Sequence, residues 1–174
     1  MSRGLKNALL VPLRKSTPER YVLIHYRVAT MIEAACMNCA NQPESGGILL
    51  GSIRGPHLEI SGFTRPGPED QRAPFHFVRQ DAKHQSAAER AWASSQRTIT
   101  FVGEWHTHPI GKPIPSSIDR KSWSALARRT KHPMLFLLAA PAKWKGFLAT
   151  RGLLMATLKE LSLCERGHSG IILR

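Results

Sequence analysis

The stretch Glu104-Trp105-His106-Thr107-His108-Pro109, followed by Ser116-Ser117-Ile118-Asp119, is the part of this chain that decides its fold and chemistry. His106 and His108 are two residues apart in a predicted strand, where side chains alternate with a period of two. Both imidazoles therefore project from one face and can reach the same ion. Asp119 lies in the first turn of a predicted amphipathic helix, so its carboxylate can point back toward the strand end. Two imidazoles and one carboxylate leave a fourth position for water, as a catalytic zinc ion requires.

Each part of this motif also has a simpler explanation. Ser116 followed three residues later by Asp119 is the pattern of a capping box with an acidic first turn, which begins many ordinary helices. Ser116 can cap such a helix and still direct its hydroxyl into the site. A His-x-His pair alone occurs in many strands that bind no metal. Other histidine-based hydrolases fit less well, because the chain has no His-Glu-x-x-His segment, and Pro109-Ile110 stands where a dinuclear site would need Asp-His.

Activation of a zinc-bound water requires a base, and Glu44 is the best candidate. It precedes Gly46-Gly47 and a short apolar strand, so its carboxylate would lie at the mouth of that strand, where small residues permit close backbone approach. The alternative is a solvated acid in a loop. Glu104 competes for the role, because alternation places it on the strand face that carries the histidines. It lies about 6 to 7 Å along the strand from His106, however, so we expect Glu104 and its neighbour Trp105 to support the site.

With these residues the chain resembles the JAMM metalloproteases of the MPN domain. The motif of that family is an upstream glutamate, then His-Ser/Thr-His-Pro, and a Ser-x-x-Asp that is separated from the second histidine by seven residues. In this chain the motif is matched at every position by Glu44, His106-Thr107-His108-Pro109, the seven residues 109–115, Ser116 and Asp119. The resemblance covers about residues 20–150.

The resemblance implies a role for each of these residues. His106, His108 and Asp119 would bind Zn²⁺, with one ion per chain. Glu44 would be the general acid and base, and Ser116 would stabilise the tetrahedral intermediate. The implied fold class is α/β, a single MPN (JAMM) domain with a mixed central sheet flanked by helices, related to the cytidine-deaminase-like architecture.

The sequence of residues 103–109 and the small size of the chain resemble those of bacterial stand-alone members of the family. Among these are deubiquitinase-like peptidases of CBASS-type antiphage operons, which remove ubiquitin-like conjugates. The resemblance thus implies a zinc isopeptidase of antiphage defence. Its partners would be a ubiquitin-like protein or its conjugate, and the activating and conjugating enzymes. The alternatives are a peptidase that processes a sulfur-carrier or other small precursor, and a metal-free MPN scaffold or DNA-associated binding protein.

Length and composition indicate one compact domain. A chain of 174 residues with 42% hydrophobic content can bury one core, and we expect a domain at 20–174 after an N-terminal extension at 1–19. The apolar run 8–13 is too short for a secretory signal, and no stretch reaches the length of a membrane span. Three cysteines fit a reducing cytoplasm. Cys36 and Cys39 lie on an amphipathic helical stripe, which favours buried thiols over a second metal or redox site.

The pattern of apolar residues predicts alternating strands and helices. Strands are expected at 21–26, 47–53, 58–63, 75–79, 99–105, 134–139 and 146–150, and helices at 28–40, 82–96 and 116–130. The segment 134–138 is apolar without alternation, as in a central strand covered on both faces. At 153–174 two readings stay open: Leu154, Leu158 and Leu161 suit a helix, and 171–173 suits an edge strand.

Charge and proline content provide two further clues. The formal net charge of +13 favours a partner with an acidic surface. Nucleic acid is disfavoured as the main partner, because no helix-hairpin-helix, zinc finger or aromatic-basic pattern is present. The loops 64–74 and 109–115 contain three prolines each, so they are either preformed walls for an extended peptide or simple turns.

Overall fold

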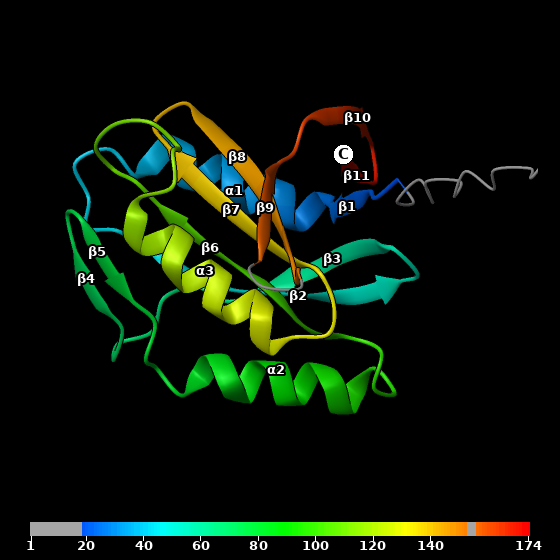
Figure 1. Ribbon diagram of the computed structural model, residues 1–174. Coiled ribbons are helices and arrows are strands. Elements are labelled where there is room, and N and C mark those ends of the chain that lie inside the picture. The colour runs from blue at the N-terminus through cyan, green and yellow to red at the C-terminus, as the bar shows by residue number, and fades with distance from the viewer. Residues whose placement is uncertain (1–18, 153–155) are drawn as a thin grey trace, which may run out of the picture.

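The computed structural model describes residues 19–152 and 156–174 (Figure 1). The expected N-terminal extension, apart from its last residue, and Leu154 lie outside the described residues. In chain order the elements are β1 (Val22–His25), α1 (Tyr26–Asn38), β2 (Gly46–Arg54), β3 (His57–Phe63), β4 (Gln71–Ala73), β5 (His76–Val78), α2 (Lys83–Ser94), β6 (Thr100–Thr107), α3 (Ser117–Arg129), β7 (Met134–Ala140), β8 (Lys143–Thr150), β9 (Thr157–Glu160), β10 (Leu163–Gly167) and β11 (Gly170–Leu173).

The centre of the molecule is a nine-stranded sheet with the order β10-β11-β1-β3-β2-β6-β7-β8-β9. The pairs β1/β3 and β6/β7 are parallel and the other neighbours are antiparallel, so the sheet is mixed, as predicted. Helix α1 covers one face, and α2 and α3 lie over the other (Figure 1). None of the helices in the described ranges is both long and apolar enough to cross a membrane.

Strand β7 shows why the sheet is covered on both faces. All seven of its residues are buried, because successive side chains enter two different cores. Its odd-numbered residues pack with α1, and Met134, Phe136 and Leu138 pack with Trp123 and Ala127 of α3. The central strand predicted from the unbroken apolar run at 134–138 is therefore confirmed.

The hairpin of β4 and β5 stands apart from the main sheet. The strand predicted at 75–79 is present as β5, but it pairs with β4 in a separate two-stranded sheet. We expected 64–74 to be a loop, and this was wrong for Gln71–Ala73, which form β4.

The C-terminal segment is built of strands, and the helical reading was wrong where the chain is described. Leu158 lies in β9, which pairs with β8, and the Leu161 N–H donates to the carbonyl of Gly146. The second reading, a strand at 171–173, is confirmed as β11, but β11 is not an edge strand. It lies between β10 and β1, and β10 forms the edge. Helix α1 also begins at Tyr26, two residues before its predicted start.

Candidate metal centre and active site

The two histidines lie where β6 ends beside β7. The strand was predicted to end at residue 105, but it continues to Thr107 and so contains His106. His106 is in register with Leu138 of the parallel neighbour β7, and the His108 N–H donates to the carbonyl of Ala139 at 2.6 Å. The neighbouring strand therefore fixes the backbone on which both imidazoles are mounted.

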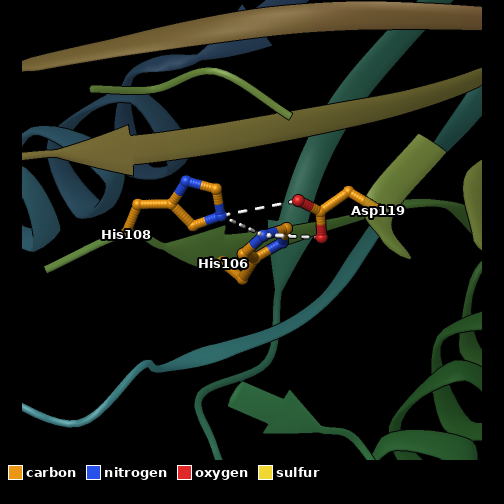
Figure 2. A group of neighbouring side chains, drawn as sticks. All are labelled: His106, His108 and Asp119. Carbon is orange, nitrogen blue, oxygen red and sulfur yellow. Dashed lines mark hydrogen bonds and ion pairs between the residues drawn. The ribbon is translucent and has the colours of Figure 1, made fainter. Parts of the chain in front are cut away.

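Asp119 completes a group of three converging side chains (Figure 2). The Nε2 atoms of His106 and His108 are 3.2 Å apart. Asp119 places Oδ1 at 3.3 Å from Nε2 of His106 and Oδ2 at 3.5 Å from Nε2 of His108. One strand, the residue just beyond it and the first turn of α3 thus bring together the three predicted ligands.

The spacing of these donor atoms fits a shared metal ion. Ligand atoms at about 2.0 to 2.1 Å from a tetrahedral ion stand about 3.3 to 3.4 Å from one another. The separations of 3.2, 3.3 and 3.5 Å lie close to that value, although Asp119 faces the two histidines through different carboxylate oxygens. Neutral imidazoles whose lone pairs face each other also require a cation or a proton between them. His106, His108 and Asp119 are therefore suited to bind one divalent metal.

The negative charge of Asp119 and the positive charges of the two histidines stabilise one another, as the pKa shifts of Asp119 and His108 indicate. Burial would raise the pKa of Asp119, but its interactions with His106, His108 and the Ser116 hydroxyl hold that pKa far below its ordinary value. Burial opposes the charged form of His108, and the Asp119 carboxylate nevertheless raises its pKa. Asp119 is thus an anion over the whole physiological range, which is the form that binds a metal.

Ser116 is the N-cap of α3 and also faces the site. Its hydroxyl accepts from the Asp119 N–H at 3.1 Å and donates to Asp119 Oδ2 at 2.7 Å, and its own N–H donates to the same oxygen. The capping box considered in the sequence is therefore present. Because the same contacts orient the Asp119 carboxylate, helix capping and site geometry coexist here.

Glu44 lies in the segment between α1 and β2, next to the histidines. Gly46 pairs with His106 in the ladder between β2 and β6, so Glu44 is brought to the site from 62 residues away in the chain. The side chain is 8% exposed. Burial raises the pKa of Glu44, and the positive charges of His106 and His108 oppose that shift. The carboxylate is thus held near the candidate ligands without being one of the three.

These residues line one cavity of about 490 Å³. One wall is β5 with its flanking residues, and another is formed by Ile110 and the start of α3. The residues around it are Glu44, Gly47, Phe75, His76, Phe77, Val78, Arg79, Glu104, Trp105, His106, His108, Ile110, Ser116, Ile118, Asp119, Ser122 and Trp123. Of the two proline-rich loops, 109–115 contributes Ile110, whereas the wall expected from 64–74 is supplied by residues 75–79.

Comparison with known proteins identifies the fold. The family described as prokaryotic homologs of the JAB domain matches residues 28–149, well over half of the chain. This chain belongs to the prokaryotic JAB family. The JAB domain is the MPN or JAMM domain that the motif indicated, so the predicted family, the single α/β domain and the hydrolase class are confirmed.

Curated relatives of this JAB-domain protein are peptidases by name. A CD-NTase/cGAS isopeptidase of Pseudomonas aeruginosa is 38% identical over 124 residues, covering 67% of this chain and 76% of that protein. One of Escherichia coli is 34% identical over 128 residues, covering 74% and 82%. A protein of Sinorhizobium fredii named as a probable metalloprotease is 30% identical over 123 residues, covering 64% and 75%.

A solved structure resembles the fold alone. It is the solution structure of a protein from Desulfitobacterium hafniense, with a TM-score of 0.57 and 21% sequence identity. The similarity covers 84% of this chain and 95% of that one.

Glu104 and Trp105 of this JAB domain point to opposite faces of β6. Glu104 accepts from Nε and Nη2 of Arg79 at 3.0 and 2.9 Å and lines the cavity. Trp105 is buried on the α1 side, and its indole N–H donates to the carbonyl of Thr64 at 2.8 Å. Trp105 thus connects β6, the strand that carries His106, to the segment before the β4–β5 hairpin. Glu104 connects the same strand to the segment after the hairpin.

Cys36 and Cys39 are buried thiols, as predicted. Burial, followed by the neighbouring Cys39, raises the pKa of Cys36 to about 11. Among the described residues, the clustered metal donors are those of His106, His108 and Asp119, so the Cys-x-x-Cys spacing forms no second group of three.

Several cavity residues were not singled out from the sequence. The ring of Trp123 in α3, for example, lies 5.9 Å from that of His106. Arg79, Phe77 and the hairpin that positions them were missed altogether. The signal available was the expected strand at 75–79, which needed a partner that Gln71–Ala73 could have provided.

Proposed function

We propose that this protein is a zinc-dependent isopeptidase that hydrolyses the bond between the C-terminus of a ubiquitin-like protein and a target amine. The observation that carries the proposal is the convergence of two imidazoles and one carboxylate beside the buried Glu44, in a single cavity. The names of the relatives support it and indicate a CD-NTase or cGAS protein as one half of the conjugate. The proposal includes a role in CBASS-type antiphage defence, which the resemblance implies, and a place in the cytoplasm, which the three cysteines fit.

Zinc is the metal that best fits the donor set. Two nitrogen donors and one carboxylate oxygen at near-tetrahedral spacing are typical of catalytic zinc, which keeps one position for the reactants. A zinc ion in this place would lower the pKa of water to about 7 and polarise the scissile carbonyl.

Glu44 is proposed as the general acid and base. Its buried carboxylate faces the cavity, and burial raises its pKa above the ordinary value, a direction that suits a group that must both accept and donate a proton. Glu44 would accept a proton from the attacking water and then donate it to the nitrogen of the leaving amine.

Ser116 is proposed to hydrogen-bond the oxyanion that develops on the scissile carbonyl. Its hydroxyl has a single proton, which is donated to Asp119 in the absence of substrate. The backbone N–H of Ser116 also donates to Asp119. The carboxylate therefore keeps one hydrogen bond when the hydroxyl turns toward substrate.

The exposed face of α2 and α3 is proposed to attract an acidic partner. Its exposed basic residues are Arg90, Arg120, Lys121, Arg128 and Arg129 in the helices, with Arg97 and Lys131 just after them. None belongs to an ion pair formed within the described ranges. Arg128 and Arg129 suit the negative end of the helix dipole, whereas Arg120 and Lys121 lie near its positive end. Helix stability therefore does not account for Arg120 and Lys121.

Salt dependence tests this face. Arg120→Glu with Lys121→Glu should lower kcat/KM several-fold at low salt, and the difference should shrink as ionic strength rises. Arg27→Glu with Lys143→Glu, exposed cations at the α1 side, is the control of equal charge. Equal losses in the two variants would remove the proposal of a specific acidic contact.

The central experiment is Glu44→Gln. Glutamine keeps the shape of the side chain but cannot accept a proton, so zinc should stay bound at about one per chain while hydrolysis falls by about 10² to 10⁴. Zinc is measured by elemental analysis. Cleavage is measured with a ubiquitin-like protein and a CD-NTase protein, each joined through its C-terminus to a reporter. A zinc-loaded wild type that cleaves neither substrate would favour the scaffold hypothesis over the enzyme.

A further inference from the structure

The segment that carries Glu44 is held on one side by the metal strand. The Ser45 N–H donates to the Thr107 hydroxyl at 2.9 Å, and the Thr107 N–H donates to the Ser45 carbonyl at 2.8 Å. Thr107 lies between the two histidines, so these bonds set the distance between the Glu44 segment and the ligands. These two bonds do not involve the residues on the N-terminal side of Ser45.

That side is held by the β4–β5 hairpin. Arg72 of β4 donates from Nε to the Glu44 carbonyl at 2.9 Å and from Nη2 to the Pro43 carbonyl at 3.3 Å. The Glu44 N–H donates to the carbonyl of Ala73 at 2.9 Å. One guanidinium thus binds the carbonyls of two consecutive residues, a geometry that a rigid fork of donors can satisfy and a single ammonium cannot.

We propose that Arg72 is a positioning residue for Glu44, an inference that rests on the proposed function. Arg72 does not line the metal cavity; it lines a separate cavity of about 210 Å³ behind the Glu44 segment. It therefore acts on the reaction through the Glu44 backbone. Its hydrogen bonds fix the residues before Ser45, and the bonds to Thr107 fix Ser45 itself. A carboxylate displaced by about 1 Å can lose about two orders of magnitude in rate.

The same clamp couples the cavity wall to the base. Arg72 is the register partner of Phe77, whose ring lines the metal cavity. That ring lies so close to Gly46 that a Cβ added there would meet it at 2.5 Å. A substrate that displaces the Phe77 ring would therefore shift the hairpin that holds Glu44. It would also shift the backbone at Gly46, which the ring contacts.

The kinetic test compares Arg72→Ala with a matched control, Arg65→Ala. Arg65 is exposed and lines the same rear cavity, but none of the hydrogen bonds in the described part of the chain joins it to residues 43–45. Arg72→Ala should keep zinc and lower kcat about 10- to 100-fold, with KM changed less than about two-fold. Arg72→Lys should recover only part of kcat, because its ammonium reaches one carbonyl. Arg65→Ala should behave as wild type.

A double-mutant cycle separates positioning of Glu44 from general support of the fold. If Arg72 acts through the Glu44 carboxylate, Arg72→Ala should change the residual rate of Glu44→Gln by less than about two-fold. Full additivity of the two losses, or an Arg72→Ala enzyme as active as the Arg65→Ala control, would overturn the inference. An inactive Glu44→Gln beside an active Arg72→Ala would leave the proposed function standing.

Amide hydrogen exchange tests the clamp without any substrate. Measured by NMR on the zinc-loaded protein, Arg72→Ala should speed exchange of the Glu44 N–H, which is bonded to Ala73, at least about ten-fold. The Ser45 N–H, bonded to Thr107, should change much less. Arg65→Ala should leave both rates unchanged. Unchanged exchange at Glu44 in Arg72→Ala would refute the clamp even if no conjugate were cleaved.

Discussion

Asp70 closes the base of the β4–β5 hairpin, and we expect Asp70→Asn to destabilise the protein strongly. Its carboxylate is fully buried. One oxygen accepts from the Gly67 N–H at 2.7 Å and lies 2.8 Å from Nε2 of His84, and the other accepts from the N–H groups of Gln80 and Asp81 at 2.9 Å each. The entry and the exit of the hairpin are thus bonded to a single charged group.

The magnitude follows from the number of donors that lose a charged acceptor. Asparagine offers one neutral oxygen and an NH₂ group, and this NH₂ group must face donors. A hydrogen bond to a buried charge contributes about 1.5 to 3 kcal/mol, and each buried donor left without an acceptor costs about 1 to 3 kcal/mol. We therefore expect a loss of about 3 to 5 kcal/mol in the free energy of unfolding. For a chain of this size that corresponds to a Tm lower by about 6 to 20 °C.

The effect should depend on pH in a defined direction. Burial would raise the pKa of Asp70, but the Gly67 N–H, His84 and the Asp81 and Gln80 N–H groups hold it well below its ordinary value. The unfolded chain therefore takes up the proton first as pH falls. The stabilisation is complete above about pH 4 and is lost below it, as pH falls toward the folded pKa.

Urea unfolding of wild type and Asp70→Asn at pH 7, 5, 4 and 3 measures this. The difference in unfolding free energy should be constant from pH 7 to 5 and shrink below about pH 4. Glu69→Gln, an exposed neighbour, is the control and should change stability by less than about 0.5 kcal/mol. A loss under about 1 kcal/mol at pH 7, or a difference that persists unchanged at pH 3, would show that Asp70 does not hold the hairpin as a buried anion.

Two further predictions concern the metal centre. His108→Ala and Asp119→Ala should each lose bound zinc, because two remaining ligands cannot close the site; stoichiometric zinc in purified His108→Ala would remove it from the ligand set. Glu104→Gln should retain zinc and lower kcat less than Glu44→Gln does, because Glu104 pairs with Arg79 and only orients its surroundings. Loss of cleavage in Glu104→Gln with zinc retained, beside an active Glu44→Gln, would identify Glu104 as the base.

The positions of His106, His108 and Asp119 could be predicted from the sequence because they depend on one strand and one helix that lie close together in the chain. The two histidines share a face through strand alternation, and a first-turn aspartate of a helix is placed by the helix itself. Glu44 is different. It reaches the histidines through the pairing of β2 with β6, in which Gly46 faces His106. No periodicity in the chain encodes that register, so local sequence made Glu44 only a candidate base, and the family motif supplied the stronger reason to choose it.

The hairpin could not be predicted because little of its stability is local. Its two strands have three residues each and none of these is buried, so neither shows the alternation of a buried face. It is held by the buried Asp70 at its base and by Arg72 on the Glu44 segment, through contacts that span 10 to 29 residues.

At Leu158 and Leu161 the local pattern predicted a helix that is not present. Their spacing suits a helix, but the free edge of β8 offers backbone partners that the local pattern does not show.

The basic residues of α3 show where folding and function separate. Asp119 and the two arginines of the last turn lie where the helix dipole favours their charges, so stability alone could place them. Arg120 and Lys121 lie near the positive end, are exposed, and follow directly after a candidate metal ligand. Two positive side chains there are unfavourable to the helix dipole. They also repel a metal ion bound by Asp119. Natural sequences break local rules of this kind mainly at functional sites, and we therefore propose that Arg120 and Lys121 face an acidic surface of the substrate.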